Sequence, residues 1–134
     1  MDFELPIRVY WEDTDAGGIV FYANYLKFFE RARTEWLRSL GIAQSTLREQ
    51  TGGMFVVSET QVRYLQPARL DDRLRVTARL EEAGRASMVI AQQAFLLADG
   101  SPLLAEGRIR IGWVDAATLR PARIPSIVLE ALHA

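Results

Sequence analysis

The sequence predicts a fold of the α+β class, in which an antiparallel sheet of about five strands wraps around one long helix. One segment repeats apolar residues at three- and four-residue spacing, which is typical of a helix with one buried face. Several later segments have the composition or alternation of strands and are joined mostly by short turns. The order of one strand, a long helix and then four strands favours an antiparallel sheet with the helix against one face. We expect a single domain spanning residues 1–134.

The first strand is expected at residues 5–11, which alternate roughly between apolar and polar side chains. Residues 12–18 are acidic and end in two glycines, so they predict a loop. The long helix is expected at about residues 24–40, with Asn24 as its N-cap and Gly41 as its stop. The apolar face of this helix consists of Tyr25, Phe28, Phe29, Ala32, Trp36 and Leu40.

A second, short helix is expected at residues 42–50. Residues 54–65 are rich in Val, Thr and Tyr and predict a strand. Residues 73–80 alternate strictly between apolar and polar side chains, so this strand is expected to bury one face. The glycine-containing residues 81–86 predict the turn that follows.

A strand at residues 87–97 is apolar on both faces, which predicts a central place in the sheet. Asp99-Gly100 is a strong hairpin signal, and residues 103–114 predict the last long strand. A short helix is expected near residues 126–132.

Charge and residue counts exclude several function classes. The 16 basic and 17 acidic side chains leave a formal net charge of -1, which supplies no basic field for nucleic acid. The absence of cysteine excludes a disulfide scaffold, a thiol nucleophile and a cysteine zinc site. The one histidine, His133, lies at the end of the chain, so we expect neither a histidine-based triad nor a histidine metal site. In an enzyme, carboxylates, tyrosines, backbone amides or a cofactor would have to carry the chemistry.

The first residues are acidic and lack the basic-then-apolar pattern of a secretory signal. No apolar run approaches the ~20 residues that span a bilayer. We therefore expect a cytoplasmic protein that does not insert into a membrane.

The segment 11–25 is the candidate site. Glu12, Asp13 and Asp15 place three carboxylates within four residues, directly before Gly17-Gly18 and the start of the helix. Their mutual repulsion opposes folding unless a charge is used or is satisfied by nearby amides. Glycines allow a ligand to approach the backbone closely, and free N–H groups at a helix start can stabilise an oxyanion.

A purely structural interpretation is equally open on spacing alone. Acidic loops with glycine before a helix are common, and Asp13 or Asp15 can cap a turn. Tyr22 and Tyr25 can be core residues.

The residues 12–20 (EDTDAGGIV), followed by Tyr22, Asn24-Tyr25 and residues 30–33 (ERAR), resemble the hotdog-fold thioesterases. Within them the chain is similar to the 4-hydroxybenzoyl-CoA thioesterase group and its Tol-Pal-associated acyl-CoA thioesterase branch. The resemblance implies a long helix wrapped by an antiparallel sheet, and subunits paired into homodimers or homotetramers. It also implies hydrolysis of acyl-CoA without a metal or a cofactor.

By this resemblance Asp15 is the catalytic carboxylate, acting as nucleophile or general base, and the backbone N–H of Tyr22 polarises the thioester carbonyl. Many members of the Tol-Pal branch carry histidine at the Tyr22 position and tyrosine at the Trp11 position, whereas the hydroxybenzoyl group uses an aromatic residue at the former. The candidate substrate-binding residues are Gly17, Gly18, Asn24, Tyr25, Glu30 and Arg85.

Two other functions are alternatives, of which the first is disfavoured. A hotdog hydratase or dehydratase generally needs a histidine in its site, and the chain offers none there. A non-catalytic acyl-CoA-binding or scaffold protein would bind acyl-CoA without releasing free coenzyme A.

Overall fold

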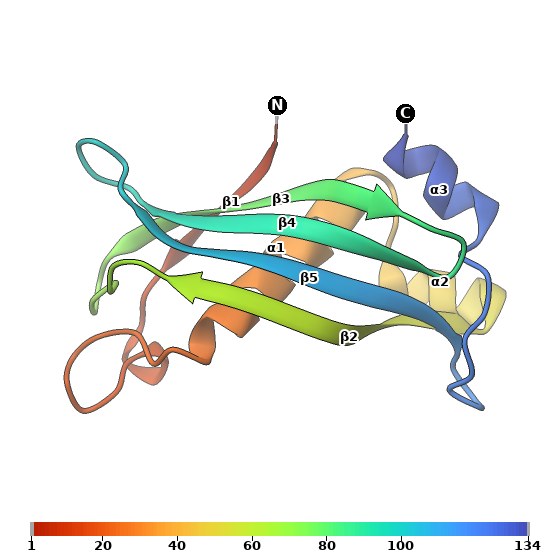
Figure 1. Ribbon diagram of the computed structural model, residues 1–134, viewed down its shortest axis with the longest axis horizontal. Helices are drawn as coiled ribbons and strands as arrows, with labels where there is room; N and C mark the ends of the chain where they lie inside the picture. The colour runs from red at the N-terminus through yellow and green to blue at the C-terminus, as the bar shows by residue number, and fades with distance from the viewer. Residues whose placement is uncertain (1, 134) are drawn as a thin grey trace.

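Five antiparallel strands form one sheet in the order β1-β3-β4-β5-β2, and the long helix α1 crosses one face of it (Figure 1). The computed structural model describes residues 2–133. The strands are β1 (Phe3–Arg8), β2 (Gly53–Tyr64), β3 (Arg73–Ala83), β4 (Ser87–Leu96) and β5 (Leu103–Asp115). The helices are the 3-10 turn η1 (Trp11–Asp13), α1 (Asn24–Ser39), α2 (Gln44–Thr51) and α3 (Ser126–Leu132). The predicted α+β class is confirmed.

The core lies between α1 and the sheet. Phe28 and Phe29 on α1 are completely buried, and burial of each side chain contributes roughly 1.5–3 kcal/mol. Leu74, Val76 and Ala78 of β3 are buried as their alternation predicted, whereas Leu80 is half-buried and Thr77 on the predicted solvated face is buried. Strand β4 occupies the predicted centre of the sheet. Leu40 was expected on the buried face of the helix, but it is 37% exposed because α1 ends one residue earlier. Gly41 ends the helix as predicted. It has a φ of 85°, and its N–H donates to Arg38 O.

The predicted extents of two strands are wrong. The first strand is Phe3–Arg8 instead of residues 5–11, because its pairing with β3 ends at Arg8 and the chain turns into η1 at Trp11. The strand β3 runs on to Ala83 through the predicted turn, because a bulge between Leu80 and Glu82 lets the pairing with β4 continue. No helix in residues 2–133 is both long and apolar enough to span a bilayer.

The two ends of the sheet carry different loops (Figure 1). The segment before α1 lies against the β2–β3 connection, where the Val20 N–H donates to Ala68 O at 2.9 Å. The β3–β4 turn lies at the opposite end, where the Trp113 N–H near the end of β5 donates to Ala86 O. The candidate site therefore belongs to the end at which α1 begins.

Candidate active site

Residues 14–20 form a narrow hairpin, called here the Asp15 hairpin. Thr14 and Val20 pair as an antiparallel bridge at its base. The Asp15 N–H donates to Ile19 O at 2.9 Å, and the Gly18 N–H donates to Asp15 O at 3.0 Å. Gly18 has a φ of 81°, in the left-handed region that glycine adopts without strain. The second glycine of the motif is therefore required by the turn itself.

The Asp15 carboxylate stands exposed on this hairpin. Its Oδ1 accepts a hydrogen bond of 2.8 Å from the Gly17 N–H. Within residues 2–133, no donor is bonded to its Oδ2. One oxygen is thus held by the hairpin while the other is available to a ligand.

Asp13, in contrast, points inward and is only 3% exposed. Its Oδ2 accepts the Tyr10 N–H and its Oδ1 accepts Asn24 Nδ2, each at 2.8 Å. Asn24 was expected to be the helix N-cap, but it is the first residue of α1, and Ala23 occupies the cap without a side-chain bond. The Asn24 side-chain amide donates to Asp13, and its backbone N–H donates to the Phe21 carbonyl.

The start of α1 offers two unused donors. The N–H groups of Asn24, Tyr25 and Leu26 donate to carbonyls three residues earlier. The N–H groups of Tyr22 and Ala23 donate to no acceptor in the described part of the chain. They lie at the positive end of the 16-residue helix dipole, where a developing negative charge is stabilised.

A pocket of about 280 Å³ adjoins the Asp15 hairpin and is walled by three tyrosines. Tyr25 and Tyr64 meet at tilted rings with centroids 5.6 Å apart, and Tyr22 meets Tyr64 edge-on at 6.1 Å. The Tyr25 hydroxyl accepts the Ala68 N–H at 3.3 Å. Burial raises the pKa of Tyr25 above its ordinary value, and burial likewise raises the pKa of Tyr64. Tyr25 is therefore a core residue, as one interpretation predicted, and it also lines the pocket.

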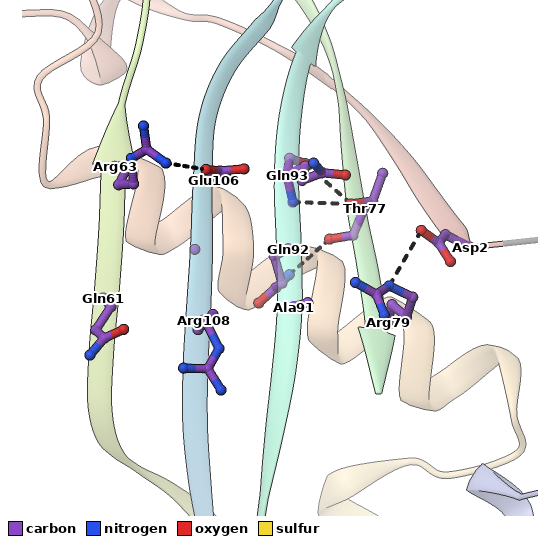
Figure 2. A pocket seen from close by; sticks show the side chains of 11 residues that line it. Asp2, Gln61, Arg63, Thr77, Arg79, Ala91, Gln92, Gln93, Glu106 and Arg108 are labelled. Carbon is purple, nitrogen blue, oxygen red and sulfur yellow. Dashed lines mark hydrogen bonds and ion pairs between the residues drawn. The ribbon is translucent and has the colours of Figure 1, made fainter. Parts of the chain in front are cut away.

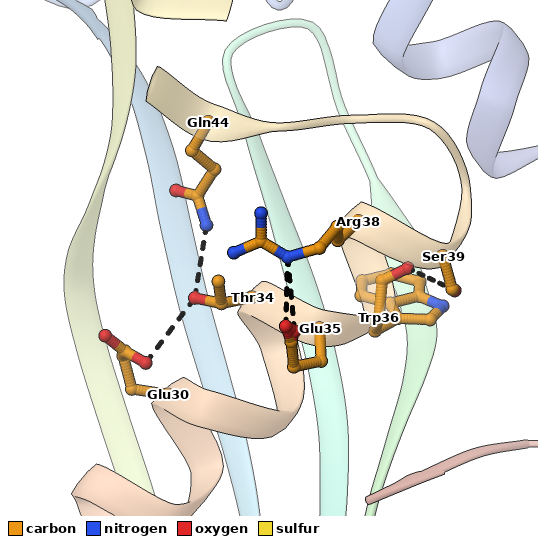
Figure 3. Close-up of polar contacts among 7 residues, drawn as sticks. All are labelled: Glu30, Thr34, Glu35, Trp36, Arg38, Ser39 and Gln44. Atoms are coloured by element: carbon orange, nitrogen blue, oxygen red, sulfur yellow. Dashed lines mark hydrogen bonds and ion pairs between the residues drawn. The ribbon is translucent and has the colours of Figure 1, made fainter. Parts of the chain in front are cut away.

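Glu30 lies farther along α1 and lines a cleft of about 460 Å³ between α1, α2 and β2. Figure 3 shows it at one end of a short polar chain. Gln44 Nε2 donates to the Thr34 hydroxyl at 3.3 Å, and that hydroxyl donates to Glu30 Oε2 at 3.4 Å. Glu30 is thus separated from the Asp15 hairpin along the helix.

Arg85 is exposed in the β3–β4 turn, at the end of the sheet away from Asp15. A single chain therefore does not bring Arg85 to the candidate site. A further depression of about 270 Å³ lies on the face of the sheet opposite α1, as Figure 2 shows with the helix behind the strands. It is lined by charged and amide side chains such as Arg63, Arg79 and Glu106, and no residue of the Asp15 hairpin reaches it.

Within residues 2–133, no three His, Asp or Glu side chains are grouped as metal ligands. The acidic residues of the motif lie in different environments: Asp13 is buried, whereas Glu12 and Asp15 are exposed.

Two contributors to the site escaped the sequence reasoning. Tyr64 is 39 residues beyond Tyr25 (64 − 25) in the sequence, and only the sheet brings it to the pocket. The inward direction of Asp13 had no signal in the sequence, because it depends on donors from Tyr10 and Asn24 that only the fold brings together.

Comparison with known proteins places the chain in a family. A family model described as the thioesterase-like superfamily matches residues 9–132. The acyl-CoA thioesterase YbgC of Haemophilus influenzae is 40% identical over 131 residues, which cover 98% of this chain and 94% of that protein. The acyl-CoA thioesterase YbgC of Helicobacter pylori is 33% identical over 133 residues, which cover 95% of this chain and 97% of that protein.

Solved structures agree. A hypothetical protein of Aquifex aeolicus, AQ1494, superimposes with a TM-score of 0.88 at 32% identity, covering 97% of this chain and 98% of that one. A 1,4-dihydroxy-2-naphthoyl-CoA thioesterase of Synechocystis has the same fold, with a TM-score of 0.89 at 20% identity over 99% of this chain and 96% of that one. The predicted hotdog fold is confirmed. Because the family model spans residues 9–132 and a relative 40% identical matches nearly the whole chain, the protein belongs to the thioesterase-like superfamily and is a hotdog-fold thioesterase.

Proposed function

We propose that this protein hydrolyses acyl-CoA thioesters to a free acid and coenzyme A, with Asp15 as nucleophile or general base. The observation that carries the proposal is the juxtaposition in the chain of an exposed carboxylate and two unused backbone donors. The Asp15 hairpin leads directly into the N–H groups of Tyr22 and Ala23 at the start of α1. The names of the relatives, which are acyl-CoA thioesterases, supply the substrate class.

In this mechanism the thioester carbonyl oxygen accepts a hydrogen bond from the Tyr22 N–H. As nucleophile, the Asp15 carboxylate attacks the carbonyl carbon, the coenzyme A thiolate leaves, and water hydrolyses the resulting mixed anhydride. As general base, Asp15 instead takes a proton from the water that attacks the carbonyl. In both cases negative charge builds on the carbonyl oxygen, and one such donor contributes roughly 100- to 1,000-fold to the rate.

The remaining predicted residues receive roles that fit their places. Gly17 and Gly18 leave the backbone of the hairpin open to the thioester, and Tyr25 walls the pocket beside it. Glu30 contacts a substrate that extends along α1. Arg85 meets coenzyme A only if a second subunit brings it to the site.

The edge of the sheet supports a homodimer. Strand β2 has 12 residues and forms an outer edge of the sheet, whereas the other edge, β1, has six. A long unpaired edge readily pairs with another strand. We propose that β2 pairs with β2 of a second copy, and that two dimers can associate further into a tetramer.

The test is a panel of acyl-CoA substrates with detection of free thiol, comparing the wild type with Asp15→Asn. The amide keeps the shape of the carboxylate but is neither a nucleophile nor a base, so kcat falls at least about 100-fold. The matched control is Glu12→Gln, since Glu12 is an exposed acid three residues away. Full activity in Asp15→Asn would remove Asp15 from the mechanism. Binding of acyl-CoA by the wild type without thiol release would instead favour the non-catalytic acyl-CoA-binding function.

A further inference from the structure

The carboxylate of Asp13 lies where three segments meet. Asp13 and Asn24 are two of the four polar residues that are buried in residues 2–133. The two Asp13 oxygens accept the backbone N–H of Tyr10, before the hairpin, and the side-chain amide of Asn24, after it. The Asp13 carbonyl accepts the Phe21 N–H at 3.0 Å. Asp13 therefore forms hydrogen bonds with the segments before and after the Asp15 hairpin.

No cation compensates this charge. In the part of the chain that the structure describes, no Lys or Arg forms an ion pair with Asp13. A buried carboxylate is costly unless hydrogen-bond donors satisfy it, so the two N–H donors at 2.8 Å are what stabilise it. This makes the bond between Asp13 and Asn24 sensitive to any change in donor or acceptor.

The bond stands at the base of the proposed catalytic groups. Asp15 follows Asp13 by two residues, and Tyr22 precedes Asn24 by two. The Thr14–Val20 bridge begins at the residue that follows Asp13. The position of Asp15 relative to the N–H groups at the helix start therefore depends on this side-chain bond, together with the backbone bonds of Phe21 and of the hairpin.

We propose that Asp13 and Asn24 are positioning residues, which hold the Asp15 hairpin against the start of α1 so that the Asp15 carboxylate and the Tyr22 N–H meet the same carbonyl group. This rests on the proposed function of Asp15. Neither side chain touches the substrate, because both are buried. The contact acts on kcat, since a displacement of about 1 Å between catalytic groups costs roughly 100-fold in rate.

The pair can be tested by exchanging donor and acceptor. Asn24→Asp sets one carboxylate against another and removes the amide donor that Asp13 requires. An acid in the first turn of a helix is favoured by the dipole, which offsets part of the cost of this repulsion. The exchange Asp13→Asn with Asn24→Asp restores one donor facing one acceptor and keeps an oxygen for the Tyr10 N–H.

Asp13→Asn alone is expected to be the mildest change. In the described residues the Asn24 Oδ1 accepts no hydrogen bond, so the Asn24 amide can turn over and offer that oxygen to the new amide. Asp13→Asn and Asn24→Asp are thus expected to lower kcat by different amounts, which a general loss of stability would not produce.

The measurement is kcat and KM of the folded protein for an acyl-CoA substrate, with amide hydrogen exchange of residues 14–21 as a readout that needs no activity. In Asn24→Asp we expect kcat to fall about 100-fold with KM within about threefold, and faster exchange in the hairpin. In the double variant Asp13→Asn with Asn24→Asp, we expect kcat to be at least tenfold higher than in Asn24→Asp alone. We also expect slow amide hydrogen exchange in the hairpin of this variant.

A wild-type kcat in folded Asn24→Asp would overturn the proposal. So would a kcat in the double variant that is no higher than in Asn24→Asp. If Asn24→Asp does not fold, Asn24→Ser replaces it, and a wild-type kcat in that variant is equally contrary. An inactive wild type would instead refute the proposed function, and hydrogen exchange would then report on the contact alone.

Discussion

The Asp13 carboxylate accepts a hydrogen bond of 2.8 Å from the side-chain amide of Asn24, eleven residues later in the chain. This contact joins the turn η1 to the first residue of α1 and closes the loop that presents Asp15. The hairpin between the two residues is held mainly by backbone bonds, with side-chain bonds from the Asp15 carboxylate to the Gly17 N–H and from the Thr14 hydroxyl to Trp11 O. The geometry of the candidate site is therefore sensitive to small changes in this loop.

The turn of the Asp15 hairpin depends on Gly18. Its φ of 81° strains any residue with a Cβ, although no atom would contact a Cβ placed there. Gly18→Ala is expected to lower the free energy of unfolding by about 1–2 kcal/mol and to lower kcat, because the strain shifts the hairpin. Denaturant unfolding and thioester turnover measure both. Gly18→Asn is the control and should be milder, since asparagine tolerates the left-handed region; equal effects of Ala and Asn would contradict this account.

The start of β2 depends on a close approach between Gly53 and Trp113. A Cβ at Gly53 would lie 2.4 Å from Trp113 Cζ2, whereas a Cβ at Gly112 would have its nearest contact, Ala86 O, at 3.8 Å. Gly53→Ala should therefore destabilise the protein by about 1–3 kcal/mol through overpacking. Gly112→Ala on β5 is the matched control and should be tolerated. Thermal unfolding of the two variants compares them, and similar melting temperatures would speak against the clash.

The buried phenol of Tyr25 predicts a loss of stability in alkali. Burial raises the pKa of Tyr25 in the folded protein above the unfolded value of about 10. Below that value the phenol is neutral in both states, so it adds no pH dependence. As the pH rises further, the unfolded chain loses the proton first, and stability falls until the folded pKa is reached.

Tyr25→Phe removes this dependence, and it also removes the acceptor of the buried Ala68 N–H. We therefore expect the variant to be less stable than the wild type by about 1–3 kcal/mol at pH 8, with a gap that narrows above pH 10. Urea unfolding at a series of pH values measures the gap. A gap that stays constant would show that Tyr25 does not carry the alkaline effect.

The proposed dimer predicts an effect at Val57, an apolar residue that is 52% exposed on the edge strand β2. Val57→Arg places a charge at the proposed contact, so the dissociation constant should rise at least tenfold, about 1.4 kcal/mol. Light scattering over a concentration series measures the molar mass. Leu119→Arg is the control, because Leu119 is also an exposed apolar residue, at 61%, but lies after β5. A monomeric wild type would refute the dimer.

Local pattern was sufficient for most elements. The three- and four-residue spacing of α1 placed Phe28 and Phe29 in the core, and the apolar character of β4 placed it at the centre of the sheet. The end of β3 was not predictable, because residues 81–83 pair with β4 only through a bulge that polar side chains do not signal. The predicted end of β1 was wrong for a related reason, since alternation cannot show where a strand stops pairing with its neighbour.

The sequence by itself limited the chemistry that is available: with no cysteine and a single histidine outside the acidic motif, carboxylates, tyrosines, backbone amides or a cofactor were the candidate groups, and the family resemblance selected Asp15. Only the tertiary structure decided how the acids divide, with Asp13 turned inward to Asn24 and Asp15 exposed. The physical reason is that a carboxylate is buried only where donors converge on it, and the donors of Tyr10 and Asn24 meet only after β1 and α1 have packed on the same sheet.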